Sequence, residues 1–173
     1  MTRDQLIETG KKRGYVLYSD LDELLPEDYA GGPELDDLLA ALESAGVEIR
    51  DESHDRVLEP SEDYSDDPIQ VYVNEIGKVP QLTRDEEIDL AKLIQSGDPE
   101  AEAAKVKLLE ANLLLVVPVA ERFASSVIHL LDLIQEGNKG MLAAVDKYDY
   151  TRGYKFSTYA TWWARRFIIR ATR

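Results

Sequence analysis

The chain has 173 residues, of which 44% are hydrophobic, so it is long enough to bury one ordinary core or two small ones. It contains no cysteine, which excludes disulfides and thiolate metal sites and fits a cytoplasmic protein. No apolar run reaches transmembrane length, and the two histidines lie far apart in dissimilar contexts, so a metal or catalytic role for either is improbable. We therefore expect no membrane span, no metal site and no cofactor.

The net charge of −14 is unevenly distributed along the chain. Residues 1–66 carry 19 acidic and 6 basic side chains, whereas residues 138–173 carry 2 acidic and 8 basic ones. Such asymmetry indicates a charged partner. The acidic head is expected either to attract the basic tail or to occupy a site meant for DNA.

The first fifty residues predict a small helical module. Asp4–Arg13 has the pattern of a short amphipathic helix, and Ser19 with Asp22 resembles a capping box for a one-turn helix. Pro33 stands at a predicted first helical position. The helix that follows it has an apolar stripe formed by Leu35, Leu38, Leu39 and Leu42.

Residues 51–66 are acidic and lack periodicity, so we expect a flexible tether there. Helical spacing begins at Asp67, and Thr83 predicts the cap of a further helix. Pro99 predicts the start of a long helix, which Pro118 should kink or break because proline lacks an N–H and clashes with the preceding turn.

The segment His129–Tyr148 predicts two helical pieces that meet at Gly137–Asn138. Polar residues surround its apolar positions and predict a docking face for a partner. This face comprises Asp132, Leu133, Gln135, Glu136 and Asn138. No strand alternation is evident anywhere, so the predicted fold class is all-α.

The stretch from Tyr148 to Arg170 interleaves aromatic rings with cations, the combination that stacks unpaired bases and neutralises their phosphates. Ser157 is a plausible N-cap for a helix here. One face of that helix would carry Tyr159, Trp162, Trp163, Arg166 and Arg170, and the other would be apolar. Tryptophans at helical spacing are commonly core residues, but the cations favour the presentation of at least one at the surface.

Several of these stretches resemble a bacterial primary, housekeeping-type sigma factor of RNA polymerase, from its acidic first region through region two. The motifs are DPIQVYVNEIG (67–77), LTRDEEIDLAK (82–92), EANLLLVV (110–117), DLIQEGNKG (132–140) and RGYKFSTYATWW (152–163). The head is similar through KKRGYVLYSDLDELLPED (11–28). The resemblance implies an acidic, DNA-mimicking and autoinhibitory helical module (1–50), an acidic linker (51–66), and a helical bundle of the region-two type (67–173) that is truncated at its carboxyl end.

In such a factor the docking face binds a coiled coil of the largest subunit of core RNA polymerase. The aromatic and basic helix melts the promoter minus-ten element and captures its single non-template strand. By resemblance, the wedge at the bubble edge is Tyr159, Trp162 and Trp163, and the flipped adenine is held by Tyr148, Arg152, Tyr154, Phe156 and Thr158. A flipped thymine is held by Asn112 and Leu115, the downstream strand meets Tyr72, Val73 and Asn74, and phosphates meet Lys147, Lys155 and Arg170.

The chain departs from the family pattern in places. Arg166 stands where glutamine is usual, and Ile169 where threonine is usual. These positions contact the first, still-paired base step, so the base preference there is undetermined, since arginine prefers guanine edges or phosphate. Leu114 replaces a usual arginine, and Pro118 a usual serine. The chain stops at Arg173, before the regions that read the minus-thirty-five element.

Two other functions were weighed against promoter melting. An inhibitory, polymerase-binding decoy or truncated inactive fragment would use the same surfaces, and deletion of residues 1–66 would discriminate, because DNA binding should then appear only in a promoter-melting factor. An enzyme would need a paired acid and base in a pocket, and the carboxylates here sit on predicted helix surfaces without a partner histidine or cysteine. We therefore expect no catalytic residues and no small-molecule substrate.

Overall fold

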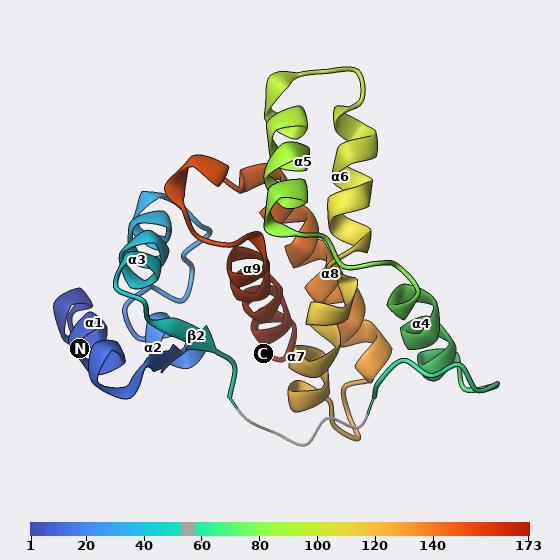
Figure 1. Cartoon of the computed structure of the whole chain (residues 1–173). Helices are drawn as coiled ribbons and strands as arrows, with labels where there is room; N and C mark the ends of the chain where they lie inside the picture. Colours follow the sequence, from blue (N-terminus) through green and yellow to red (C-terminus); the bar gives the residue numbers. More distant parts are fainter. Residues whose placement is uncertain (53–57) are drawn as a thin grey trace. The chain divides into compact units, whose positions relative to one another are not determined.

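The computed structural model describes residues 1–52 and 58–173, which form two compact units (Figure 1). Residues 1–52 and Thr151–Tyr154 make up the first unit, and residues 58–150 and 155–173 make up the second. Helices dominate both, with only two short strands in the described residues, so the predicted all-α class is confirmed. None of the described helices is long and apolar enough to cross a membrane.

The first unit combines helices with a small parallel sheet. Its elements are α1 (Arg3–Arg13), β1 (Tyr15–Leu17), α2 (Tyr18–Asp22), α3 (Pro33–Ser44) and β2 (Glu48–Arg50). The two strands pair in parallel, with Tyr15 opposite Glu48 and Leu17 opposite Arg50. They escaped prediction because three residues are too few to show an alternating pattern.

The core of this unit follows the predicted leucine stripe of α3. Leu35, Leu38, Leu39 and Leu42 are all buried, which confirms that prediction. The predicted capping box of Ser19 and Asp22 is wrong. The carboxylate of Asp20 instead accepts a hydrogen bond from the backbone N–H of Leu17 at 2.9 Å, at the start of α2.

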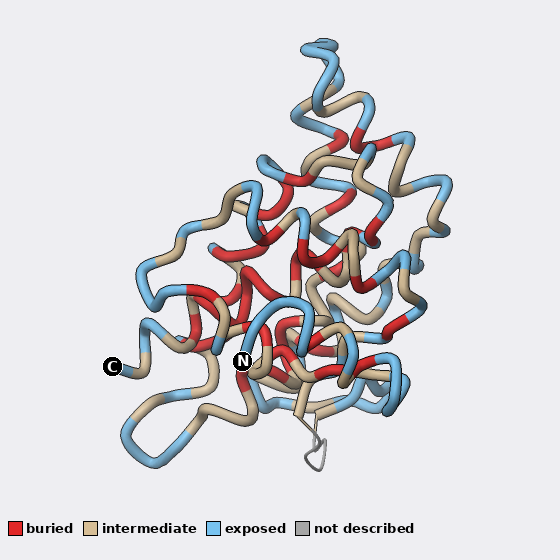
Figure 2. The backbone as a smooth tube through the Cα atoms, turned by 90° about the vertical axis from the view of Figure 1, so that its left-hand side faces the viewer, coloured by how far each residue is buried: buried red, intermediate tan, exposed pale blue. Residues whose placement is uncertain are grey.

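The second unit is a helical bundle. It contains α4 (Pro68–Gly77), α5 (Arg84–Ser96), α6 (Ala101–Glu110), the 3₁₀ turn η1 (Leu113–Leu115), α7 (Val116–Phe123), α8 (Leu130–Lys147) and α9 (Phe156–Ala171). A second 3₁₀ turn, η2 (Tyr150–Arg152), precedes α9. Helices α5 and α6 form an antiparallel hairpin (Figure 1), whose connecting turn is exposed, in pale blue at the top of Figure 2. Helix α8 packs along α9, and α7 contacts both.

Helix boundaries in this unit follow local chemistry. The hydroxyl of Thr83 accepts a hydrogen bond from the backbone N–H of Glu86 at 3.2 Å and caps α5, as predicted. The predicted long helix does break before Pro118, since Pro118 lies in the first turn of α7, where its missing N–H would have no intrahelical partner. Ser157 is not an N-cap. Helix α9 begins at Phe156 after an extended Lys155, with no side-chain cap.

Helix α8 is continuous, so the prediction of two pieces meeting at Gly137–Asn138 is wrong. Its glycines serve close packing instead. A Cβ at Gly137 would collide with side chains of Val116 and Ile168, and one at Gly140 would lie 2.5 Å from the carbonyl oxygen of Trp163. The glycines therefore let α7 and α9 approach α8 closely.

The predicted tether of residues 51–66 lies partly outside the described residues, at 53–57. The described part after that gap makes specific contacts with the second unit. The N–H of Leu58 donates to the carboxylate of Glu121 at 2.9 Å, and the N–H of Ser61 donates to Asn74 Oδ1 at 2.8 Å. At least four residues of the predicted tether are thus held against the bundle.

Candidate nucleic-acid interface

The aromatic residues of α9 and the segment before it form one connected cluster within the second unit. The rings of Trp162 and Trp163 meet edge to face at 5.3 Å between centroids, and Tyr148 meets Phe156 in the same way at 5.3 Å. Tyr159 joins the two pairs, at 5.9 Å from Tyr148 and 6.1 Å from Trp163. The rings of the cluster thus meet edge to face or at a tilt, the arrangements that aromatic pairs prefer.

These rings are buried in this structure. Trp162 and Trp163 are 1% and 2% exposed. The prediction that at least one tryptophan is presented at the surface is therefore wrong for this conformation. The helical face that also carries Tyr159 packs as tightly as the predicted apolar face, because α9 is enclosed by α7 and α8 along much of its length.

Two of the three predicted phosphate-binding cations, Lys147 and Arg170, lie beside aromatic rings of this segment, whereas Lys155 lines the cavity described below. The ammonium of Lys147 stands 4.7 Å from the ring centre of Trp163, and the guanidinium of Arg166 stands 4.7 Å from that of Trp162. Arg170 lies 5.9 Å from the ring of Phe167. Lys147, Lys155 and Arg170 are exposed, whereas Arg166 is buried. Cation–π contact thus keeps positive charge beside the rings.

The sequence predicts five residues for a flipped adenine, and the structure divides them between the two units. Tyr148, Phe156 and Thr158 belong to the second unit. The other two belong to the first, where Arg152 forms an ion pair with Asp37 at 2.6 Å and the hydroxyl of Tyr154 donates to Asp36 at 2.7 Å. Two carboxylates of α3 thus occupy the polar groups of two predicted DNA contacts.

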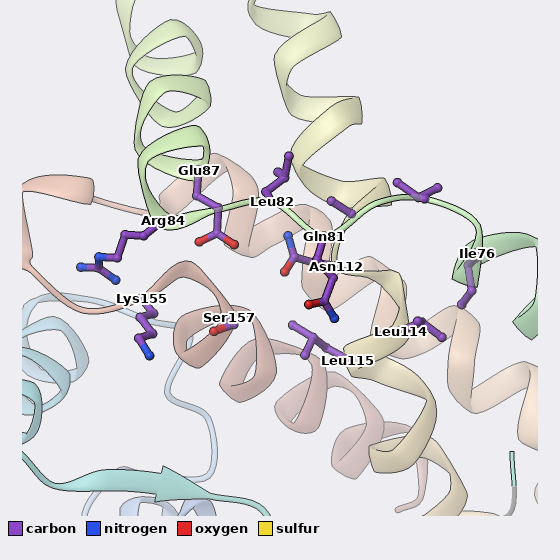
Figure 3. A pocket seen from close by; sticks show the side chains of 12 residues that line it. Ile76, Gln81, Leu82, Arg84, Glu87, Asn112, Leu114, Leu115, Lys155 and Ser157 are labelled. Atoms are coloured by element: carbon purple, nitrogen blue, oxygen red, sulfur yellow. The ribbon is translucent and has the colours of Figure 1, made fainter. Parts of the chain in front are cut away.

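A cavity of about 330 Å³ lies within the second unit, between α5, the turn after α6 and the start of α9 (Figure 3). It contains both residues predicted for a flipped thymine, Asn112 and Leu115. Its remaining lining comes from the end of α4, loop 79–82, the first turn of α5, the turn after α6 and the start of α9: Ile76, Val79, Gln81, Leu82, Arg84, Glu87, Ala111, Leu114, Lys155 and Ser157. Six of the twelve lining residues are apolar and six are polar or charged, so the cavity offers a ligand both apolar walls and hydrogen-bonding groups.

Two hydrogen-bond acceptors, on Asn112 and Glu87, lie among the polar groups of the cavity, beside the cations of Arg84 and Lys155. Asn112 is buried, and its Nδ2 donates to the carbonyl of Leu108 at 2.8 Å, which turns its oxygen toward the cavity (Figure 3). The carboxylate of Glu87 also points into the cavity. Burial raises the pKa of this carboxyl above its ordinary value, against the opposing effect of the nearby Arg84 and Lys155 cations.

The raised pKa of Glu87 predicts a pH dependence of stability. The folded chain binds this proton more tightly than the unfolded chain, so stability should fall as pH rises from the ordinary pKa of glutamate through the raised one. Glu87→Gln removes this cost and should be more stable than the parent at neutral pH, with the difference vanishing near about pH 4. Thermal unfolding across this pH range measures it. Glu86→Gln, at an exposed neighbour, is the control, and a pH-independent difference for Glu87→Gln would contradict the argument.

The predicted contacts of the downstream strand and of the polymerase meet between α4 and α8. Asn138 Nδ2 donates to the hydroxyl of Tyr72 at 3.0 Å. Asp132 and Gln135 are exposed on α8, and Glu136 pairs with Lys139 at 2.9 Å. Leu133 is 1% exposed and belongs to the core, so its side chain is not presented on the predicted docking face.

Sequence reasoning missed most of the cavity lining. The cap at Thr83 places Arg84 and Glu87 in one helical turn, which was a usable signal for their common face. Nothing local indicates that loop 79–82 meets the turn after α6. Among the described residues, no group of three or more ligating side chains fits a metal ion.

Three family models match consecutive parts of the chain: region 1.1 of the sigma-70 factor over residues 3–70, region 1.2 over 67–100 and region 2 over 108–173. The chain is 44% identical over 174 residues to the RNA polymerase sigma factor SigA of Clostridium acetobutylicum, covering 96% of this chain and 45% of that protein. It is 42% identical over 188 residues to SigA of Listeria monocytogenes, covering 98% and 50%.

The chain thus spans about half the length of the curated relatives it matches. The three models together account for nearly all of its residues, in the order of the elements described above. The head, the α4–α5 segment and the bundle from the end of α6 through α9 correspond to successive regions of one family. The chain belongs to the sigma-70 family of RNA polymerase sigma factors and carries the regions 1.1, 1.2 and 2 of a primary sigma factor.

Proposed function

We propose that this chain binds core RNA polymerase and melts the promoter minus-ten element by capturing flipped bases of the non-template strand. The observation that carries this proposal is the cavity around Asn112 and Leu115. The resemblance places both residues at a base-binding pocket, and they line one hollow with the carboxylate of Glu87. The relatives named RNA polymerase sigma factors support the same role.

The chemistry of the cavity favours thymine. The oxygen of Asn112 and the carboxylate of Glu87 are acceptors, and they suit a base whose Watson–Crick edge carries an imino N–H, as in thymine and guanine. Leu82, Leu115 and Ile76 offer apolar walls for the thymine methyl group. A base held in this way must first leave its stack, which costs least in a melted strand.

The aromatic cluster is proposed to hold the upstream edge of the melted DNA. Tyr159, Trp162 and Trp163 would stack against the last paired bases, and the flanking Lys147 and Arg170 would meet phosphates. Because both tryptophans are buried here, this step requires a conformation in which a ring becomes accessible. Binding energy from the polymerase at the docking face of α8 is the proposed source.

The acidic module is proposed to restrain DNA binding in the free chain. Asp37 and Asp36 already pair with Arg152 and Tyr154, two of the residues proposed to hold adenine. Carboxylates here take the place that phosphate or base acceptors would take. DNA must therefore compete with the chain's own acidic groups.

The test is binding of the full chain to a single-stranded TATAAT oligonucleotide and to a scrambled one, with and without core polymerase. We expect preference for TATAAT, and about tenfold tighter binding by the double variant Asp36→Asn and Asp37→Asn, which corresponds to loss of about 1.4 kcal/mol of competition. The variant Glu23→Gln with Glu43→Gln makes the same charge change at exposed carboxylates of the same module. It should bind like the parent, apart from a small, salt-screened gain.

The alternative is that the chain is an inhibitory, polymerase-binding decoy. The departures at Arg166, Ile169 and Leu114 favour this alternative, because they change residues that would face DNA. Core binding without any preference for TATAAT, in the parent and in the Asp36 and Asp37 variant alike, would establish the decoy and exclude base capture.

A further inference from the structure

Helix α4 holds the backbone of the residues that precede it, and we call Glu59–Ser61 the linker strap. Gln70 Nε2 donates to the carbonyl of Glu59 at 2.8 Å, and the N–H of Ser61 donates to Asn74 Oδ1 at 2.8 Å. Gln70 and Asn74 stand one turn apart on α4, and they engage the carbonyl and the N–H that flank Pro60. The helix therefore recognises a short extended main chain, as it would a bound peptide.

Gly77 is the third residue of α4 that accommodates the linker strap, and together with Gln70 and Asn74 it forms what we call the seat. A Cβ on Gly77 would lie 2.6 Å from both Cβ and Cγ of Pro60, which is closer than real contacts allow. Gly77 is a helical residue without a positive φ, so its role is the close approach and not an unusual backbone conformation. The proline ring thus sits in a notch that any side chain at position 77 would fill.

The seat fixes the amide of Asn74. Gln70 Nε2 also donates to Asn74 Oδ1 at 2.8 Å, so two N–H donors converge on one atom, which must be the oxygen. Asn74 is one of the residues proposed to meet the DNA strand downstream of the minus-ten element. While the strap is seated, the acceptor of this side chain is already used.

The strap also carries negative charge to this surface. Between Ser61 and the N-cap Asp67 the chain turns back on itself, with the hydroxyl of Ser61 accepting from the N–H of Asp63 at 3.1 Å. This acidic loop contains Glu62, Asp63, Asp66 and Asp67, and its Tyr64 is 93% exposed. Carboxylates held beside α4 repel the phosphates of an approaching strand.

We propose that the linker strap is a built-in competitor of the downstream DNA strand on α4, which the strand displaces when it binds. The proposal rests on the proposed function, because it takes Tyr72 and Asn74 as strand contacts. It is separate from the contacts of Asp36 and Asp37, since all strap contacts lie within the second unit. Nucleic-acid affinity therefore depends on a second internal acidic segment.

The test is the variant Gly77→Ala in the full chain, bound to core polymerase and to a single strand that extends past TATAAT on its downstream side. The added methyl expels Pro60, and alanine is compatible with the helix, so the fold should persist. We expect about fivefold tighter binding, the effect of removing one ordinary competing hydrogen bond. Val71→Ala, at an exposed position of the same helix, is the matched control and should leave affinity unchanged.

Hydrogen exchange of the Ser61 N–H provides a direct second measurement. Its protection should be lost in Gly77→Ala and in the parent once the strand is bound. Neutralising the loop with Glu62→Gln, Asp63→Asn and Asp66→Asn should tighten binding at low salt and lose that gain at high salt. Asp67 is kept because it caps α4.

The outcomes separate the two proposals. If the parent does not prefer TATAAT, the proposed function fails whatever the strap does. If the parent prefers TATAAT but Ser61 stays protected in the complex, and Gly77→Ala and the neutralised loop bind like the parent, only the strap proposal is overturned. Weaker binding by Gly77→Ala would overturn it as well, because the strap would then support the strand.

Discussion

Replacing Trp162 by alanine is expected to lower the free energy of unfolding of the second unit by about 3–5 kcal/mol. The ring is 1% exposed, meets Trp163 edge to face at 5.3 Å and lies 4.7 Å from the guanidinium of Arg166. Its removal leaves a cavity between tightly packed helices and exposes the charge of Arg166 to a void. Urea unfolding followed by far-ultraviolet circular dichroism measures the loss.

The size of this effect decides how the DNA-binding role of the tryptophans is tested. Loss of TATAAT binding in an alanine variant could arise from the destabilised helical bundle. The variant Trp163→Phe therefore tests DNA contact more directly. The indole N–H of Trp163 has no hydrogen-bond acceptor among the described residues, and phenylalanine keeps an aromatic ring, so the cost should stay below about 1.5 kcal/mol. Normal stability with weakened TATAAT binding would identify a direct contact. A Trp162→Ala variant as stable as the parent would contradict the packing described here.

The fold was predictable where the signal is local. Thr83 and Gly97 bound α5, Pro33 begins α3, and the break before Pro118 follows from the missing N–H of proline. Each of these depends on a residue and its neighbours within one turn. The leucine stripe of α3 was equally readable, because its period is that of a helix with one buried face.

The fold was not predictable where a residue's role depends on a contact with a residue far away in the sequence. Gly137 looked like a helix breaker. It is required instead because side chains of Val116 and Ile168 from other helices approach so closely that a Cβ there would collide with them. The face of α9 with Trp162 and Trp163 looked like a presented surface, because periodicity cannot say how many neighbours enclose a helix. Helices that are enclosed on most sides lose the two-faced pattern on which such reasoning depends.

The candidate site divides in the same way. Asn112 and Leu115 came from the resemblance, while Glu87 and Gln81 appear only once the loop before α5 is placed beside the turn after α6. The pairing of Arg152 with Asp37 joins residues more than a hundred positions apart. The charge asymmetry predicted attraction between head and tail, but not which side chains would pair.

Gly140→Ala is expected to destabilise the pairing of α8 and α9 by about 1–3 kcal/mol, although alanine favours a helix more than glycine does. The new Cβ would lie 2.5 Å from the carbonyl oxygen of Trp163 and 2.9 Å from the Cα of Ala164. These are backbone atoms, so the clash is relieved only by shifting α9 as a whole. Urea unfolding followed by tryptophan fluorescence measures the cost, because both tryptophans of the chain lie on α9.

Gly77→Ala is the matched control, since it adds the same methyl at the last residue of α4, where it meets only the exposed Pro60. It should unfold near the urea concentration of the parent, because the strap contacts that it removes are exposed and alanine favours the helix. Equal stability of the two alanine variants would contradict the close approach of α8 and α9.

The shift of α9 in Gly140→Ala should also reduce TATAAT binding while core polymerase binding persists, because Asp132 and Gln135 lie on the exposed surface of α8, away from Gly140's buried contact. Packing between two helices would then control base capture without any change in a residue that touches DNA.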